Sequence, residues 1–593
     1  MMIREYFDKV VILLKTAQDL KQHLLSINKR SYPAYKDTKG SYRFGSYILN
    51  IDHVQGDPFA SPSSLHVEIP HKNAGFPTFT YEKDCSRIAL QDFLTRRLAS
   101  QFEDFNFKAK GSGKSGLLSI TRCGQEVLER SACQITAAGI TARFHVGFPA
   151  FGRTINAGEL EKILFDFLPR CVENSFFYRK LDGKQVEQAV FLAEDQEAVR
   201  HILKEEKLAA FVANGSILPR KSGVSDLPLK DSVPFVSPAS MERTFTLPHR
   251  GKITGMAIPE GITLIVGGGY HGKSTLLEAL QNGVYDHIAG DGREFVITDS
   301  TAVKLRAEDG RSIRNVNISM FINDLPNKKD TSVFSTPDAS GSTSQAAGVV
   351  ENIEAGSRLF LIDEDTSATN FMVRDDFMQQ VISRDKEPIT PFLERARDLF
   401  EKAGISTILV AGSSGAFFYI ADKIVQMDCY RPVDITDKVK ALCKDHQAPR
   451  TQAPGFAVPS FTRALPPYGR GRQGGSDRRG RDYGRGRDGG SRHEHMKIKS
   501  FGKDSFSLDK ETVDLRYVEQ LADSEQTSAL AHMLRYALEQ VIDGRKSVQQ
   551  TVAVLEDLLN KKGWEPFCSS YVPCGLAKPR TQEIFACLNR FRG

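Results

Sequence analysis

The chain has 593 residues, of which 40% are hydrophobic and 26% are charged, and its formal net charge is +6. A chain of this length is too long to fold around one hydrophobic core, so we expect about two to four domains. The composition is that of an ordinary globular protein. The nine cysteines form no C-x-x-C pair, so we expect a reducing compartment and neither a metal centre nor a disulfide framework. There is no signal-peptide pattern and no run near the roughly 20 apolar residues of a transmembrane segment, so we expect a cytoplasmic protein.

Residues 1–240 are predicted to form an N-terminal α/β domain, because segments with helical spacing alternate with strand-like segments. The expected helices are 6–25, 88–105, 159–168 and 185–203, and the expected strands are 44–51, 65–69, 117–121 and 141–146. The serine- and proline-rich stretch 221–248 is interpreted as the connection to the next domain.

A basic loop at 108–116, K-A-K-G-S-G-K-S-G, imitates a phosphate-binding loop inside this domain. Lysine stands at position 108, where the motif requires its first glycine, and no clean buried strand precedes it, so we do not expect a second nucleotide site. A basic turn that contacts a nucleic-acid backbone and a plain exposed loop remain the alternatives. The first of them makes 1–240 a candidate nucleic-acid-binding domain.

The octapeptide G-G-G-Y-H-G-K-S at 267–274 is the most informative motif of the chain. It follows the apolar run 262–266 and precedes the helical run 275–280, which is the strand–loop–helix order that a phosphate loop requires. Its glycines let backbone N–H groups converge on phosphate oxygens, and the following helix presents its positive end to the same anion. Lys273 is predicted to reach the β and γ phosphates, and Ser274 to hold Mg²⁺. The predicted ATP contacts here are Gly267, Gly268, Gly269, Gly272, Lys273, Ser274 and Thr275.

A second acidic element supports this interpretation. The apolar run 359–362 is typical of a buried parallel strand and ends in Asp363 and Glu364, and ligands bind beyond the carboxyl ends of such strands. Asp363 is therefore predicted to hold Mg²⁺. Glu364 is predicted to orient or deprotonate the attacking water, and Glu364 and Lys273 are the two predicted catalytic residues. The alternative is that both acids only cap a helix.

Two further segments resemble the ABC ATPases. The sequence D-E-D-T-S-A-T-N at 363–370 is similar to their D-E-P-T-S-A-L-D segment, and A-S-G-S-T-S-Q at 339–345 loosely resembles their L-S-G-G-Q signature. In that class the signature addresses the ATP held by the other subunit, so the resemblance implies a head-to-tail homodimer. The residues implied to contact the partner's nucleotide are Ser340, Gly341, Ser342 and Gln345.

The chain is similar to a family of predicted single-cassette ABC-class ATPases, some members of which are linked to RNA binding. The segments that carry this resemblance are 267–277, 290–294, 335–346 and 363–375. The resemblance implies an α/β fold with an ABC-type P-loop core at 241–445. It also implies ATPase activity with ATP and Mg²⁺.

One departure from ordinary ABC cassettes concerns the switch histidine expected after the strand at 407–410, which is absent here. Ser413 in this segment is predicted to bind ATP by donating a hydrogen bond to the γ-phosphate, but it cannot perform a histidine's proton chemistry. We therefore expect hydrolysis to be slow or to depend on Glu364 alone.

The segment 446–496 is predicted to be a disordered linker, followed by a small helical cap domain at 497–593. Within the linker, 468–492 contains eight arginines and three aspartates, a net charge of +5. Flexible arginines pair with phosphates and stack on bases, which favours RNA or single-stranded nucleic acid as a partner over a merely solvated linker. The predicted nucleic-acid contacts are Arg470, Arg472, Arg478, Arg479, Arg481, Arg485 and Arg487.

The sequence thus predicts an ABC-class ATPase that works as a dimer and is coupled to RNA or another nucleic acid. Two alternatives remain: a regulatory module whose nucleotide is structural, and a cassette that acts on protein partners or membrane subunits. Phe245 could stack on adenine, although the pattern favours a core phenylalanine. Tyr270 and His271 are assigned no catalytic role.

Overall fold

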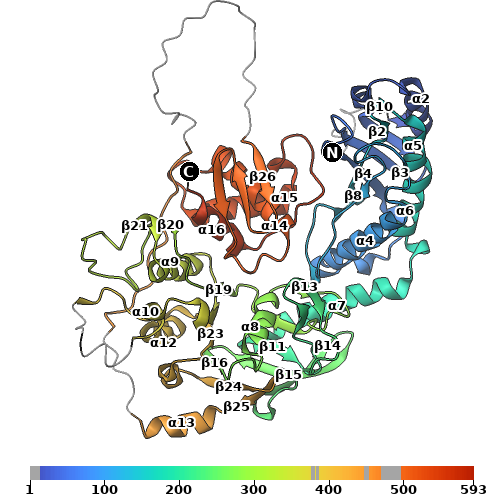
Figure 1. Ribbon diagram of the computed structural model, residues 1–593. Helices are drawn as coiled ribbons and strands as arrows, with labels where there is room; N and C mark the ends of the chain where they lie inside the picture. Colours follow the sequence, from blue (N-terminus) through green and yellow to red (C-terminus); the bar gives the residue numbers. More distant parts are fainter. Residues whose placement is uncertain (1–13, 375–380, 382–385, 447–452, 469–495, 593) are drawn as a thin grey trace, which may run out of the picture.

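The computed structural model describes residues 14–374, 381, 386–446, 453–468 and 496–592, and Figure 1 shows their arrangement. The chain forms an N-terminal region, a central region and a C-terminal domain that contacts both of the others. The described part of the chain contains no helix with the length and apolarity needed to cross a membrane.

The N-terminal region is a largely antiparallel sheet covered by helices. The strand order is β1–β2–β3–β4–β8–β5, with β7 also paired to β8. The strands are β1 Lys15–Thr16, β2 Gly40–Phe44, β3 Tyr47–His53, β4 Ser63–Pro70, β5 Leu118–Ser119, β7 Cys133–Ile135 and β8 Gly139–Val146; the helices are α2 Ala17–Ile27, α3 His71–Ala74, α4 Asp84–Phe105, α5 Ala157–Lys162, α6 Leu168–Phe176 and α7 Gly183–Glu205. These elements confirm the α/β prediction, although the first part of the expected helix at 6–25 lies outside the described residues.

A second antiparallel sheet joins the N-terminal region to the central one. Its order is β14–β15–β11–β18, and the strands are β11 Leu208–Ala213, β14 Glu242–Leu247, β15 Gly251–Pro259 and β18 Val296–Thr298. Strand β11 precedes the expected boundary at residue 240, yet both of its partners among the described strands, β15 and β18, follow this boundary. The serine- and proline-rich stretch 221–248, expected as a connection, contains most of the hairpin of β12 Arg220–Ser222 and β13 Ser225–Pro228, and it also contains β14.

The central sheet has the order β19–β22–β23–β16–β24–β25, and all of its pairings are parallel except the last. Its strands are β16 Ile262–Val266, β19 Val303–Leu305, β22 Leu359–Asp363, β23 Ser406–Val410, β24 Lys423–Asp428 and β25 Arg431–Asp434; the surrounding helices are α8 Lys273–Asn282, α9 Gly341–Glu354, α10 Thr369–Met372, α12 Phe392–Ala403 and α13 Thr436–Lys444. Strand β22 is buried along its whole length, as the apolar run predicted. Because β16, β22 and β23 are parallel, their carboxyl ends lie at the same edge of the sheet.

Besides the β12–β13 hairpin, the described residues form three further two-stranded pairings outside these sheets: β9 Ala150–Phe151 with β10 Thr154–Ile155, β6 Glu126–Val127 with β17 Asp286–His287, and β20 Arg311–Val316 with β21 Phe334–Ala339.

The C-terminal domain contains the predicted helices and also an unpredicted antiparallel meander, β26–β27–β28. Its elements are β26 Ile498–Phe501, β27 Ser505–Leu508, β28 Glu511–Asp514, α14 Ser524–Tyr536, α15 Val548–Lys562 and α16 Thr581–Arg590. Each of these strands has four residues, and a period-2 pattern as short as this is weak evidence for a strand.

A buried ion cluster fastens the C-terminal domain to the N-terminal region. The guanidinium of Arg130 is 2% exposed, and it pairs with Asp523 at 2.8 Å and with Glu525 at 2.7 Å. The hydroxyl of Thr121 also donates to Glu525 at 2.6 Å. Burial, the largest influence, raises the pKa of Glu525 against the opposing charge of Arg130.

We expect Arg130→Ala to lower the free energy of unfolding by about 3 kcal/mol, because it leaves two carboxylates largely buried without their cation. Urea denaturation measures the change. Arg516→Ala is the matched control, since Arg516 pairs with Asp514 at an exposed site and its loss should cost less than about 1 kcal/mol. Equal destabilisation by both substitutions would contradict a structural role for the cluster.

Candidate active site

The first six residues of the octapeptide form the loop between β16 and α8, and its last two begin α8, in the strand–loop–helix order that the sequence predicted. Gly267 and Gly272 adopt φ values of +138° and +94°, which favour glycine, and a Cβ on Gly267 would lie 2.5 Å from the Met427 carbonyl oxygen. The Lys273 ammonium folds over the loop and donates to the carbonyl oxygens of Gly267 and Gly268 at 2.7 and 2.8 Å. Helix α8 begins at Lys273, so the first N–H groups of the helix have no carbonyl partner within it, an arrangement that suits an anion.

Asp363 ends β22 and Glu364 follows it, at the same edge of the sheet as this loop, with β23 between β22 and β16. Burial raises the pKa of Asp363, against the lowering effects of the Asp365 N–H group and of the charge on Lys304. A largely buried carboxylate and the hydroxyl of Ser274 are oxygen ligands of the kind that Mg²⁺ prefers. The residues present therefore fit the predicted cation.

Glu364 is held by the segment after β23, where the sequence lacks the switch histidine. Its Oε2 accepts hydrogen bonds from the N–H groups of Gly412 and Ser413 at 2.7 and 2.9 Å, and its Oε1 accepts one from the Ser413 hydroxyl at 2.5 Å. Burial raises the pKa of Glu364, but these hydrogen bonds outweigh it and hold the pKa below its ordinary value. Ser413 thus orients the predicted catalytic carboxylate, and its contact with a γ-phosphate stays a prediction.

The signature segment forms the start of α9, with Ser340 as the N-cap residue. Ser340, Gly341 and Ser342 line a polar cavity of about 530 Å³ that no residue of the 267–274 loop lines. Gln345 is different, because it is 1% exposed. Its side-chain amide accepts a hydrogen bond from the Ala368 N–H group at 2.9 Å and donates one to the Ser367 hydroxyl at 3.0 Å. Gln345 therefore joins α9 to the segment that follows β22.

The C-terminal domain also reaches this part of the molecule, which the sequence did not reveal. Glu519 accepts from Arg306 at 2.7 Å and from Lys304 at 2.5 Å, beside β19. Tyr517 lines the α9 cavity, and the guanidinium of Arg306 lies 4.3 Å from the centre of its ring. Isolated charged residues carry no sequence pattern, so only the folded chain identifies these partners.

Gln520 binds the central region through both ends of its amide. Its Oε1 accepts from the Lys304 N–H group at 3.0 Å, and its Nε2 donates to the carbonyl oxygens of Gln281 and Ala302 at 3.2 and 3.0 Å. Gln281 belongs to α8, so the C-terminal domain contacts the helix that follows the glycine loop.

The other sequence candidates have clear positions. Two N–H groups of the loop at 108–116 are bonded to other parts of the chain. The Ser112 N–H group donates to the Ala150 carbonyl oxygen at 2.7 Å and the Lys114 N–H group to that of Pro58 at 2.8 Å, so these two groups are not free to bind phosphate. Phe245 is 4% exposed and packs against Phe211 in the core. Residues 469–495, with all seven predicted nucleic-acid arginines, lie outside the described residues.

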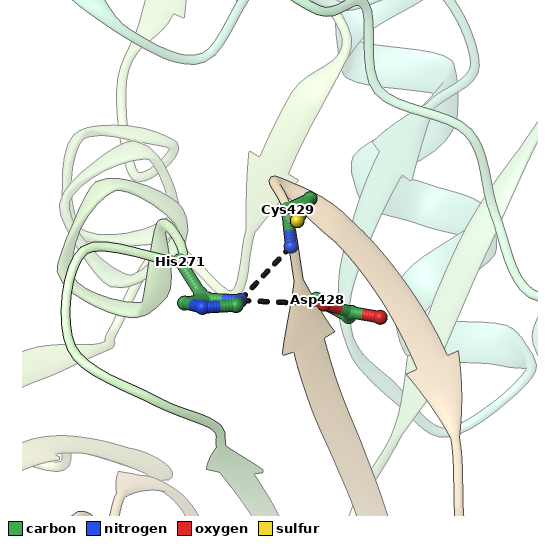
Figure 2. Close-up of side chains that lie close together, drawn as sticks. All are labelled: His271, Asp428 and Cys429. Atoms are coloured by element: carbon green, nitrogen blue, oxygen red, sulfur yellow. Dashed lines mark hydrogen bonds and ion pairs between the residues drawn. The ribbon is translucent and has the colours of Figure 1, made fainter.

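His271 fastens the glycine loop to the turn between β24 and β25 (Figure 2). The Cys429 N–H group donates to His271 Nδ1 at 3.0 Å, and Asp428 Oδ1 lies 3.4 Å from the same atom. The three side chains have potential metal ligands within 4.8 Å of one another. A metal at Nδ1 would need the lone pair that already accepts the Cys429 hydrogen bond, so we assign this group to fastening the loop.

Among solved structures, the comparison finds cbiO1 from Clostridium perfringens, part of the ABC transporter complex cbiONQ, with 12% identity, a TM-score of 0.25, and coverage of 40% of this chain and 93% of that chain. It also finds the ADP conformation of an ATP-binding cassette of an ABC transporter, with 10% identity, a TM-score of 0.24, and coverage of 40% and 95%.

Among curated proteins, an uncharacterized protein of Methanocaldococcus jannaschii is 32% identical over 235 residues, which are 37% of this chain. The chain spans about half the length of this relative, 50% of which is covered.

Family models match three consecutive parts of the chain. The MRB1590 C-terminal domain matches residues 497–593. The model of the N-terminal part of ATPases of the ABC class matches 17–179, and the P-loop domain of the ABC ATPases matches 182–463. The chain, with its glycine loop and acidic strand end in the geometry described above, belongs to the ABC-class P-loop ATPases.

Proposed function

We propose that this ATPase closes as a head-to-tail homodimer around two Mg-ATP molecules and couples hydrolysis to binding of RNA or another nucleic acid. The observation that carries the dimer is the cavity at the start of α9. A helix start lined by Ser340, Gly341 and Ser342 is suited to an anion, yet the chain's own glycine loop does not line it. A second copy supplies that anion as the triphosphate on its own loop, and two-fold symmetry makes the exchange mutual.

The residues divide the reaction among them. Lys273 and the N-terminal N–H groups of α8 bind the β and γ phosphates, while Ser274 and Asp363 hold Mg²⁺, which supplies charge neutralisation when bound. Glu364 orients the attacking water and accepts its proton. Gly412 and Ser413 keep Glu364 ionised and fixed, which is the state that a base requires. This arrangement supports turnover without a switch histidine.

Coupling to nucleic acid is supported by composition. The segment 468–492 carries a net charge of +5 out of the +6 of the whole chain, so electrostatic attraction to phosphates is concentrated there.

Lys273→Ala and Glu364→Gln are expected to separate binding from turnover. The lysine substitution removes ATP binding, whereas Glu364→Gln keeps binding and lowers kcat by about 100-fold or more, because the water loses its base. A nucleotide-affinity measurement and a phosphate-release assay test this pair. Equal turnover by wild type and Glu364→Gln would favour a regulatory module with a structural nucleotide.

The same variants test the dimer. Sedimentation should show Glu364→Gln as a dimer with Mg-ATP and as a monomer without it, while Lys273→Ala stays monomeric under both conditions. A Glu364→Gln protein that binds Mg-ATP and remains monomeric at high concentration would refute the head-to-tail arrangement.

Ser413→Ala should shift the acid limb of kcat/KM for ATP to higher pH. The hydrogen bonds to Glu364 stabilise its ionised form and lower its pKa, so removing the hydroxyl donor raises the pKa. The base is active only when ionised, and activity is then lost earlier as the pH falls. Ser414→Ala is the control in the same loop, because the Ser414 hydroxyl accepts from the Ala416 N–H group instead. Coincident acid limbs for wild type and Ser413→Ala would disprove this role.

Deletion of 468–492 should weaken RNA binding and flatten its salt dependence. Removing one ionic interaction with a phosphate reduces the slope of log affinity against log salt by about 0.7 for single strands. Fluorescence anisotropy with a single-stranded RNA at several salt concentrations measures the slope. A linker of equal length with each arginine replaced by glutamine is the control for chain length. An unchanged slope in both proteins would favour protein partners or membrane subunits over nucleic acid.

A further inference from the structure

We infer that the adenine of the bound nucleotide stacks on Tyr430, in an apolar cavity that the hairpin turn between β24 and β25 shares with residues 229–235. This inference rests on the proposed nucleotide site and adds the residues that recognise the base. The sequence candidate for stacking, Phe245, is buried against Phe211 and is not available for this role.

The cavity begins where the phosphates end. It has a volume of about 390 Å³, within the usual range of small-molecule sites, and Gly272 and Thr275 line its inner end. Both residues lie at the start of α8, so a nucleotide whose phosphates occupy the glycine loop directs its ribose and base into this space. The remaining walls are predominantly apolar and come from segments far apart in the sequence, including Leu229, Val233, Phe235 and Met427.

Tyr430 is positioned as an exposed platform over the inner end of the cavity. Its side chain is 55% exposed, yet a Cβ placed on Gly272 would lie only 3.1 Å from its Cδ1 atom. Cys429 and Tyr430 have φ values of +47° and +68°, in the left-handed region that costs a non-glycine residue about 1–2 kcal/mol. A hairpin turn favours glycine or asparagine at such positions, so this strain indicates a selected role for the side chain.

The phosphate loop holds this turn at a fixed offset. The Tyr430 N–H group donates to the His271 carbonyl oxygen at 3.2 Å, and the Cys429 N–H group donates to the His271 ring, as Figure 2 shows. The loop that binds the phosphates and the turn that carries the ring are therefore joined through one residue. Such a connection preorganises the distance between a phosphate site and a base site.

The opposite wall provides apolar surface and a polar group for the edge of the base. Leu229 and Val233 are 39% and 40% exposed, which leaves apolar side chains open to a planar ligand. The hydroxyl oxygen of Ser232 also lines the cavity; it is buried and has no hydrogen-bond partner among the described residues. A ring nitrogen of adenine accepts a hydrogen bond from such a hydroxyl, while the neighbouring Asp231 carboxylate accepts one from the amino group.

A base-free probe separates this inference from the proposed function. Tyr430→Ala should weaken ATP binding about 10-fold or more, the usual loss when a stacking side chain is truncated, and leave the affinity for inorganic tripolyphosphate unchanged. Tyr430→Phe keeps the ring and should bind both probes as wild type does. Ser232→Ala should weaken ATP binding by a few fold and leave tripolyphosphate binding unchanged.

The outcomes are distinct when affinities are measured by calorimetry on the full chain with Mg²⁺. Wild-type ATP affinity in Tyr430→Ala overturns this inference alone. Equal weakening of ATP and tripolyphosphate in Tyr430→Ala also overturns it, because the ring would then shape the phosphate loop and not contact the base. Failure of the wild-type protein to bind either probe would refute the nucleotide site itself.

Discussion

Strand β16 hydrogen-bonds to β23 on one side and to β24 on the other, and this parallel pairing positions the whole site. Each of the three strands is followed directly by a segment of the site: β16 by the glycine loop, β23 by the Gly412–Ser413 segment and β24 by the turn carrying Tyr430. The pairing brings these segments to one edge of the sheet, although they are far apart in the sequence. Glu364, at the end of β22, then finds its hydrogen-bond donors at the end of the adjacent strand, β23. A change of strand order would separate the phosphate loop from its acidic partners even if every residue of the motif were kept.

The C-terminal domain contributes to the electrostatics of this edge. The carboxylate of Glu519 acts to raise the pKa of Asp363, whereas Lys304, which pairs with Glu519, acts to lower it. A movement of the C-terminal domain that separates this pair would change the field at the carboxylate proposed to hold Mg²⁺. The N-terminal region is bound to the same domain through the ion pairs of Arg130 with Asp523 and Glu525.

Local patterns allowed much of this molecule to be predicted from sequence. The glycine loop and the acids at the end of β22 are patterns of residues adjacent in the chain, and both were recognisable. The roles of Ser413 and Tyr430 were not, because each depends on which strands are neighbours in the folded sheet. Phe245 shows the same limit, since stacking and core packing require the same kind of side chain and only tertiary structure separates them.

The docking of Gln520 has a consequence for how the protein can be divided. Its side chain satisfies main-chain carbonyl groups of Gln281 and Ala302, and its own main-chain carbonyl oxygen accepts from the hydroxyl of Tyr285, which is 8% exposed. A fragment truncated before residue 497 would leave these groups without their partners, and unsatisfied buried polar groups are costly. The family boundary between 463 and 497 is therefore a junction in sequence and not a line along which the folded protein separates.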